Sequence, residues 1–468
     1  TLALILLVAT ATYAYFQADL GNNKEVDVTV STVPKTDLLS FSVGDPLTLQ
    51  ADETSFVKGG DSASDTTNVK ALLTAGAGTA TKYYYVYLLI SGNDFIYTQD
   101  ENTPELILTI TKPDGTELTT LDGLTYKTVT DGKGTTIKGF DITTKKGLIT
   151  IADNRKITTT STIEEQWDVT VTLVNYDVNQ INNIRKNFTS KLLIQQGEFI
   201  PSPANICSSN QSLDSCVVLL NGYVDTLYYH DNTLANGAGD NSYRYAGASA
   251  SVNNYICLGS DATTCPDANL FRIIGVFGDQ VKVIRAKSIE NQSWTTSSNT
   301  WSTSSLNTYL NGEYLTSLGT LAEKIATTMW KVGGDTNLSG VVPATAYKYE
   351  VGSSASKTTN DAKIGLIYVS DYYYGASPSA WKLVGYNGDS TKDYRAAKTI
   401  NWLCLGSNEW TISRNPINSL DAFRVSYDGS VSYSRANSSY AIRPTFSLLS
   451  SVTYASGSGT SSDPIRIN

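Results

Sequence analysis

The chain has 468 residues, of which 41% are hydrophobic and 10% aromatic, and its formal net charge is −9. This length exceeds the roughly 100–200 residues of an ordinary domain, and the aromatic content excludes a wholly disordered chain. The acidic balance argues against nucleic acid as a partner, because binding to phosphates needs a basic face.

An uncharged apolar run from Leu2 to Phe16 opens the sequence. It has the length of a signal-peptide core and falls short of the about 20 residues that a transmembrane helix needs. The sequence starts at Thr1, without an initiator Met, so we interpret 1–16 as a truncated signal peptide. A retained membrane anchor and a buried segment are the alternatives. A signal peptide or an anchor implies an extracellular or cell-surface location.

Strand patterns fill residues 17–196. Val26, Val28 and Val30 alternate with polar residues, and apolar or alternating runs follow at 85–90, 105–110, 167–174 and 191–194. Turn sequences such as Pro113-Asp114-Gly115 lie between these runs at the spacing typical of a sandwich. We therefore predict an all-β, immunoglobulin-like sandwich. Residues 51–80, rich in Gly, Ala, Ser and Thr, are predicted to form a long loop.

Two prolines, Pro201 and Pro203, interrupt the β pattern. Segment 197–206 is therefore predicted to be a semi-rigid linker to a second module, 207–468.

The second module is less regular than the first. Its patterns predict strands at 270–277, 281–284, 362–369, 422–425 and 430–433. They also predict two helices, one at 217–228 and one at 304–310 that continues into 318–328, where Leu321, Ile325 and Met329 have helical spacing. Long loops rich in Gly, Ser, Tyr and Asn join these elements, so we predict an irregular α+β fold.

All five cysteines lie in the second module. Cys207 and Cys216 are nine residues apart, and Cys257 and Cys265 are eight apart. This spacing predicts two short-loop disulfides and leaves Cys404 unpaired, which agrees with export. Zinc is disfavoured, because the chain has no CxxC pair and a single His.

Two parts of the sequence resemble known families. The stretch from Tyr13-Ala14-Tyr15-Phe16 through Val26-Asp27-Val28 resembles the start of secreted proteins of the camelysin and biofilm-fibre type of Gram-positive bacteria. The second module resembles uncharacterised domains of Firmicute surface proteins, at Asn254-Tyr255-Ile256-Cys257, Cys265-Pro266, Arg272 to Val276, Trp301 to Leu306, Trp410 to Arg414 and Ala441 to Phe446. These resemblances imply an exported surface protein that begins with a β-sandwich.

The last motifs of the chain also resemble a fold. Trp410-Thr411-Ile412-Ser413-Arg414, followed by Asp428-Gly429 and Arg443-Pro444, is similar to the end of C-type-lectin-like and formylglycine-generating-enzyme-like folds. The resemblance implies a C-type-lectin-like module with long binding loops. The enzyme branch needs an active-site Cys pair, whereas Cys404 is solitary.

Few residues suggest catalysis. A Ser-His-Asp or Cys-His site would have to use His230, whose Tyr-Tyr-His-Asp-Asn context is more typical of a surface turn. A carboxylate pair of the glycosidase type leaves no local signature, and Glu409 and Asp371 are the candidates for it.

Aromatic side chains in polar loops are the stronger signal. Rings among Ser, Gly and Asn resemble a paratope, in which rigid rings supply contact area and small polar groups adapt to the ligand. The predicted ligand-binding residues are Tyr243, Tyr245, Tyr372, Tyr373, Tyr374, Trp381 and Trp410. The alternative is that these rings cap an irregular core.

No cofactor is expected except possible Ca²⁺. Asp240, Asp371 and Asp389 are candidate oxygen ligands, although no EF-hand loop occurs.

Together these patterns predict a non-enzymatic, adhesin-like surface or matrix protein that binds a glycan or an extracellular protein. The first alternative is a structural subunit of a surface or biofilm fibre that self-associates by strand exchange. The second is a carboxylate-based hydrolase.

Overall fold

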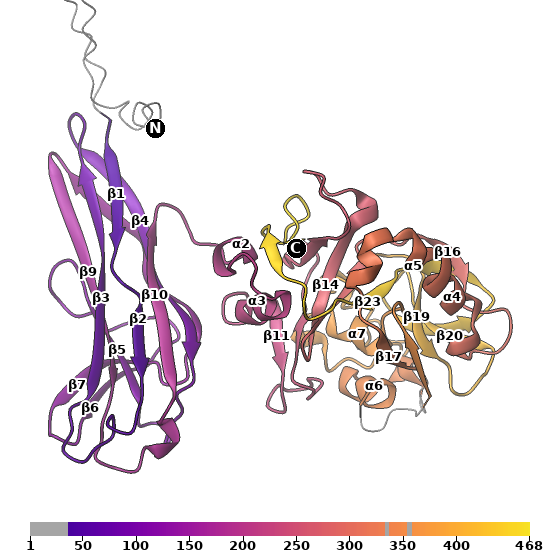
Figure 1. Ribbon diagram of the computed structural model, residues 1–468, viewed down its shortest axis with the longest axis horizontal. Coiled ribbons are helices and arrows are strands. Elements are labelled where there is room, and N and C mark those ends of the chain that lie inside the picture. Colours follow the sequence, from indigo (N-terminus) through magenta and orange to yellow (C-terminus); the bar gives the residue numbers. More distant parts are fainter. Residues whose placement is uncertain (1–35, 333–336, 353–357) are drawn as a thin grey trace, which may run out of the picture. The chain divides into compact units, whose positions relative to one another are not determined.

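The computed structural model describes residues 36–332, 337–352 and 358–468, which form two compact units, Thr1–Ile200 and Pro201–Asn468 (Figure 1). The boundary between the units falls inside the predicted linker 197–206. The last residues of that segment form helix α2 (Pro203–Ile206) of the second unit. The predicted signal segment 1–16 and the valine-rich strand near residue 28 lie outside the described residues.

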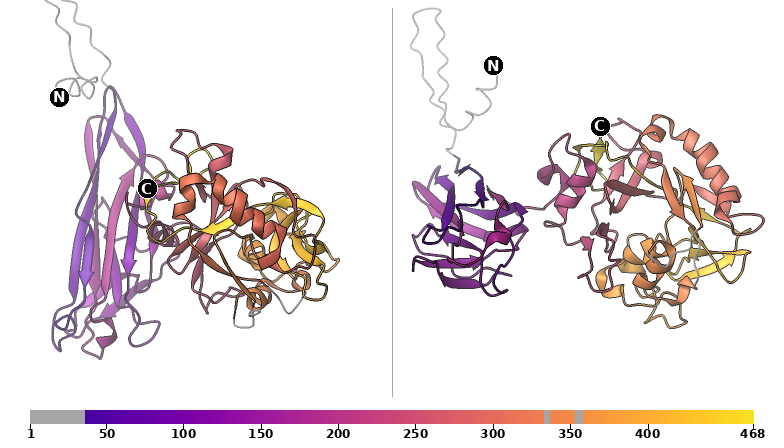
Figure 2. Two further views of the ribbon diagram at one scale, coloured as in Figure 1. Left: turned by 45° about the vertical axis from the view of Figure 1, so that its right-hand side comes forward. Right: turned by 60° about the horizontal axis from the view of Figure 1, so that its bottom comes forward.

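The first unit consists of two antiparallel sheets whose strands run side by side along its length (Figure 2). In spatial order, the six-stranded sheet contains β1 (Leu38–Val43), β3 (Ala63–Thr74), β9 (Thr162–Leu173), β5 (Leu106–Thr111), β7 (Thr136–Asp141) and β6 (Tyr126–Thr130). The four-stranded sheet contains β2 (Leu47–Gln50), β10 (Asn187–Gln195), β4 (Ala80–Asn93) and β8 (Gly147–Thr159).

Both sheets contribute to one hydrophobic core, so the first unit is a β-sandwich. The alternation of side chains predicted several strands correctly, such as Val169 and Val171 of β9, which are fully buried. The prediction of a long loop at 51–80 is wrong, because β3 lies within it. Val69, Ala71 and Leu73 of β3 alternate toward the core, but the small and polar residues that precede them, Ala63 to Asn68, are typical of a loop.

The second unit contains two larger sheets and two pairs of short strands. One sheet has the order β11 (Leu227–His230), β12 (Ser242–Tyr245), β14 (Leu270–Phe277), β15 (Gln280–Arg285) and β23 (Thr445–Ser447), and β13 (Tyr255–Cys257) also pairs with β14. The other has the order β16 (Glu290–Ser293), β22 (Ser439–Ile442), β19 (Glu409–Arg414), β20 (Asp421–Val425) and β21 (Val431–Arg435). The pairs are β17 (Thr328–Lys331) with β18 (Thr359–Ala362), and β24 (Tyr454–Ser456) with β25 (Arg466–Ile467).

The glycine at position 275 sets the spacing between strands β12 and β14. A Cβ atom added to Gly275 would lie 2.0 Å from the carbonyl oxygen of Tyr243. Only a residue without a side chain permits this approach, which carries Arg244 of β12 into the centre of the unit.

The helices of the second unit are short: α3 (Leu213–Leu220), α4 (Ser305–Tyr309), α5 (Leu315–Ser317), α6 (Pro343–Glu350) and α7 (Val369–Tyr374). The predicted helix at 217–228 ends at Leu220, and β11 begins at Leu227. The predicted helix at 318–328 is a 3₁₀ segment, Gly319–Lys324, followed by β17. Met329, expected on the apolar face of that helix, is 58% exposed.

The predicted strand at 362–369 is also wrong. Residues Ile364, Leu366 and Ile367 are buried, but β18 ends at Ala362, Gly365 forms only an isolated bridge to Thr445, and α7 begins at Val369. A short apolar run signals burial without distinguishing a strand from a buried loop.

The structure joins Cys207 to Cys216 and Cys257 to Cys265, as the spacing predicts, and leaves Cys404 unpaired. Two disulfides are typical of an oxidising, extracellular environment. No helix among the described residues is long and apolar enough to cross a membrane.

Candidate functional site

Six of the seven predicted ligand-binding rings are buried, so the prediction that they form a binding surface is wrong for them. Each is at most 2% exposed: Tyr245, Tyr372, Tyr373, Tyr374, Trp381 and Trp410. Their polar atoms are used inside the protein. The Tyr372 hydroxyl donates to the carbonyl oxygen of Gly429 at 2.7 Å, and Trp381 Nε1 donates to that of Ala376 at 2.8 Å. These rings fill the core, which was the alternative interpretation.

Tyr243 is the exception, because its side chain is half-buried. Its ring stacks on that of Tyr229 with a centroid distance of 4.6 Å. The pair lies on neighbouring strands, β11 and β12, outside the pocket described below.

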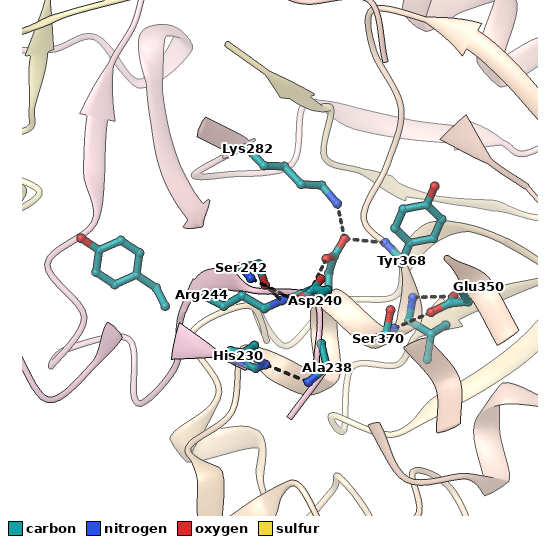
Figure 3. Close-up of polar contacts among 12 residues, drawn as sticks. His230, Ala238, Asp240, Ser242, Arg244, Lys282, Glu350, Tyr368 and Ser370 are labelled. Carbon is teal, nitrogen blue, oxygen red and sulfur yellow. Dashed lines mark hydrogen bonds and ion pairs between the residues drawn. The ribbon is translucent and has the colours of Figure 1, made fainter. Parts of the chain in front are cut away.

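His230 lies in the interior and not in a surface turn. Its side chain is fully buried, and its Nδ1 accepts a hydrogen bond from the backbone N–H of Ala238 at 3.1 Å (Figure 3). The rings of Tyr374 and Trp381 pack against it. Burial, aided by the charge of Arg244, lowers the pKa of His230 to about 3, so the imidazole is neutral. Its ring is fully buried and its Nδ1 is already bonded, so the structure does not present His230 to a substrate.

A cluster of four charged side chains lies near His230 at the centre of the unit. Arg244 comes from β12 and Lys282 from β15, while Asp240 precedes β12 and Asp371 lies in the first turn of α7. Lys282 Nζ lies 2.5 Å from Asp371 Oδ2, and Arg244 Nη2 lies 2.6 Å from Asp240 Oδ2 (Figure 3). A longer contact of 3.4 Å joins Arg244 Nη1 to Asp371 Oδ1. The cluster is neutral overall, with two cations and two carboxylates.

Asp371 connects the cluster to the backbone. Its Oδ2 also accepts the N–H of Tyr368 at 3.0 Å, at the start of α7. Its side chain is 3% exposed, and those of Arg244 and Lys282 are 2% and 9% exposed. Charges this deeply buried are tolerated because each is paired, and removing one partner exposes the others to the full cost of desolvation.

Aromatic rings surround both cations. The Arg244 guanidinium lies 4.6 Å from the ring centroid of Phe277 and 5.3 Å from that of Tyr347. Lys282 Nζ lies 4.9 Å from the ring of Tyr368 and 5.7 Å from that of Trp330. These distances fall within the range of cation–π attraction.

A pocket of about 230 Å³ opens over this cluster. All four charged side chains line it, and so do the half-buried rings of Phe277 and Tyr347. Gln280, Thr328, Met329, Lys331, Val351 and Ser447 complete much of the wall. A concave site with aromatic walls and a few convergent polar groups is the usual form of a ligand pocket. We call this the Lys282 pocket.

The ionisation of the pocket follows from burial and pairing. Burial lowers the pKa of Lys282, and Asp371 partly offsets this shift. Burial alone would raise the pKa of Asp240, but the charge of Arg244 and the hydrogen bonds from Ser242 and Arg244 lower it to about 2. The pocket thus offers fixed hydrogen-bond donors beside a fixed carboxylate acceptor.

Sequence reasoning missed Lys282, Arg244 and Glu350. The local sequence of Lys282 gives no signal, because Val281-Lys282-Val283 also fits a half-buried strand whose lysine faces solvent.

Glu350 is the last residue of α6 and is 1% exposed. Its carboxyl accepts the backbone N–H of Ser370 (Figure 3). It also accepts the backbone N–H of Val369 and the hydroxyl of Ser413. Burial raises its pKa to about 7. It does not line the Lys282 pocket, so it supports the start of α7 and has no route to a ligand there.

Glu409, the other predicted catalytic carboxylate, is buried and paired. Its Oε2 lies 2.8 Å from Arg443 Nε, and Ser407 donates to its Oε1. Burial raises its pKa, and Arg443 offsets part of that shift. Its two oxygens are thus occupied by a structural ion pair and a local hydrogen bond.

The predicted calcium ligands do not converge. Asp389 accepts hydrogen bonds from the backbone N–H and the hydroxyl of Thr391 in an exposed turn. Asp240 and Asp371 instead pair with the side chains of Arg244 and Lys282. Within 36–332, 337–352 and 358–468, no three His, Cys, Asp or Glu side chains come together as a metal site.

A larger hollow of about 800 Å³ lies beside the Cys257–Cys265 loop and the last residues of the chain. Arg466, which lines it, donates to the carbonyls of Ser260, Ala262 and Thr263. Its lining is mainly polar loop, without a buried charged cluster, so we place the candidate site at the Lys282 pocket.

Comparisons with known proteins give no family. No family model and no curated protein matches the sequence. The crystal structure of the infectious bursal disease virus VP2 subviral particle has 10% identity and a TM-score of 0.10, over 38% of this chain and 41% of that one. A TM-score this low carries no argument about fold or function.

Proposed function

We propose that the chain is an exported, non-enzymatic surface or matrix protein whose second unit binds a glycan in the Lys282 pocket. The first unit is then an immunoglobulin-like spacer, and the second a C-type-lectin-like module of a Gram-positive surface protein. Two short-loop disulfides and the sequence resemblances support export.

One observation carries the proposal: the Lys282 pocket combines half-buried rings with fixed donors and a fixed acceptor. A sugar ring has an apolar face and a rim of hydroxyl groups that both donate and accept. Phe277 and Tyr347 can pack against the face, while Asp240 and Lys282 serve the rim. We therefore keep the proposal of glycan binding and assign it to the Lys282 pocket instead of the buried rings.

The test uses the full chain on an array of glycans and extracellular matrix proteins. Tyr347→Ala removes one pocket wall, and we expect it to weaken retention on a glycan about tenfold or more, as loss of an aromatic contact does at a binding centre. Tyr243→Ala is the matched control, since Tyr243 is a half-buried tyrosine outside the pocket. Loss of binding in Tyr243→Ala alone would place the site elsewhere and refute the proposal.

The structural alternative has one observation in its favour. Strand β8 has 13 residues and pairs with a neighbour, β4, on one side only. An open strand of this length can accept a strand from another chain. Filaments under the electron microscope, together with no binding on the array, would favour the fibre subunit over the binding module.

A further inference from the structure

Lys282 has hydrogen-bonding capacity that the described protein does not use. A lysine ammonium has three N–H donors. Within the described ranges, the acceptor recorded for Lys282 Nζ is Asp371, at 2.5 Å. The side chain is 9% exposed, and it lines the pocket. A group that enters the pocket therefore meets a nearly desolvated ammonium with free donors.

The lining of the pocket carries one excess positive charge. Arg244, Lys282 and Lys331 supply three positive charges, and Asp240 and Asp371 supply two negative charges. Lys331 Nζ donates to the carbonyl oxygen of Val351 at 2.6 Å, which holds it at the wall without cancelling its charge. A ligand with one negative charge balances the lining.

The charges are also divided within the pocket. Asp240 pairs with Arg244 at 2.6 Å, whereas Asp371 is shared between Lys282, at 2.5 Å, and Arg244, at 3.4 Å. Asp240 therefore repels an anion from the Arg244 side and accepts hydrogen bonds from hydroxyl groups there. Because Asp371 divides its charge between two cations and Lys331 adds a third positive charge to the lining, the Lys282 side is left for an anion.

The volume of the Lys282 pocket limits the size of the ligand that it can hold. About 230 Å³ lies below the roughly 300–1,000 Å³ typical of pockets for drug-sized ligands. One sugar ring fits this size, with the rest of a chain outside.

We infer that the Lys282 pocket binds an acidic sugar, whose carboxylate pairs with Lys282 and whose hydroxyl groups donate to Asp240. This inference rests on the proposed glycan-binding function and specifies its ligand class. The ammonium donates a charge-assisted hydrogen bond to the carboxylate, and such a bond is strong in a site of low dielectric constant.

The experiment compares three matched probes by titration calorimetry with the full chain: glucuronate, its methyl ester and glucose. The ester keeps the shape of glucuronate and removes its charge. We expect glucuronate to bind at least about tenfold more tightly than either neutral probe, which corresponds to a charge-assisted hydrogen bond of about 1.5 kcal/mol or more. Added salt should reduce this preference.

A variant then tests whether Lys282 supplies the positive charge that binds the carboxylate. Lys282→Met keeps the length and apolar stem of the side chain, and we expect it to abolish the preference for glucuronate over its ester. Lys287→Met is the control, because Lys287 is 66% exposed and absent from the pocket lining. Should Lys282→Met fail to fold, the comparison of acid with ester in the unaltered protein decides the question alone.

The outcomes separate the inference from the proposed function. Equal binding of glucuronate, ester and glucose would refute the acidic ligand and leave glycan binding intact. Binding of none of these probes or of any arrayed glycan would refute both. Binding of an acidic peptide instead of sugars would also overturn the inference, because the carboxylate would then come from a protein.

Discussion

Replacing Asp371 by Asn tests whether the buried charge cluster stabilises the second unit. The amide keeps the size of the side chain and loses its charge, so Lys282 retains no carboxylate partner. The two carboxylate oxygens of Asp371 face Arg244 and Lys282, which are donors only. In the variant, the NH₂ group of Asn must therefore face one of these donors without forming a hydrogen bond.

The cost can be worked from burial. Removing one partner of a buried ion pair typically costs about 3–5 kcal/mol. Asp240 still neutralises Arg244, and Lys282 is 9% exposed to the pocket, so we expect the lower end, about 3 kcal/mol. At about 2–4 °C per kcal/mol for a unit of this size, the unfolding midpoint should fall by roughly 6–12 °C.

Tryptophan fluorescence of the full chain follows this transition selectively, because six of the seven Trp lie in the second unit. Asp267→Asn is the matched control. Its ion pair with Lys287 has a similar length, 2.6 Å, but both side chains are more than 60% exposed, so the midpoint should not move. Adding Lys282→Met to Asp371→Asn should restore much of the fall in the unfolding midpoint, because the double variant no longer contains the unpaired ammonium of Lys282. Equal midpoints for Asp371→Asn and the unaltered protein would refute the reasoning.

Three further predictions concern pH, a disulfide and a buried ring. The pKa of His230 is lowered to about 3, so this group contributes stability that is present above pH 6.5 and lost as the pH falls toward 3. The pKa of Glu350 is raised to about 7, so this group contributes stability that is present below pH 4.5 and lost as the pH rises through 7. The two effects oppose each other between pH 4.5 and 6.5, so Glu350→Gln should steepen the loss of stability on acidification in denaturant titrations, and an unchanged slope would contradict the assignment. Replacing both cysteines of the Cys207–Cys216 disulfide by Ser should lower the free energy of unfolding by about 2–3 kcal/mol on the chain-entropy model for a loop this short, and a loss well outside that range in urea titration would show that strain or residual structure dominates. Trp381→Ala should cost about 3–5 kcal/mol by opening a cavity, and loss of glycan binding at a temperature where circular dichroism shows the variant fully folded would contradict its purely internal role.

Local periodicity predicted the first unit well, since its strands are long and one face of each sheet is buried. Val169 and Val171 alternate with polar residues, and in a half-buried strand this alternation determines which side chains face the core. The prediction missed β3 because its first half, Ala63 to Asn68, consists of small and polar residues that are typical of loops. In the second unit the elements are too short for periodicity to decide, and tertiary contacts fix the boundaries.

The site was predicted poorly for a physical reason. Its charged residues come from β12, β15 and α7, which are far apart in the sequence, and no local spacing relates Lys282 to Asp371. Val281-Lys282-Val283 also fits the alternation of a half-buried strand, which would place the lysine in solvent. The local pattern therefore could not show that Lys282 is buried and paired.

The buried aromatic residues explain how a loop-rich unit obtains a core. Irregular segments leave backbone carbonyls without a partner in a sheet or helix, and apolar side chains cannot satisfy them. Trp381 Nε1 donates to the carbonyl of Ala376, and the Tyr372 hydroxyl donates to that of Gly429, so each ring fills space and satisfies a carbonyl at once. Aromatic residues among Ser, Gly and Asn are thus as consistent with an irregular interior as with a binding surface. Only burial separates the two, and it assigns six of the seven rings to the interior of the unit.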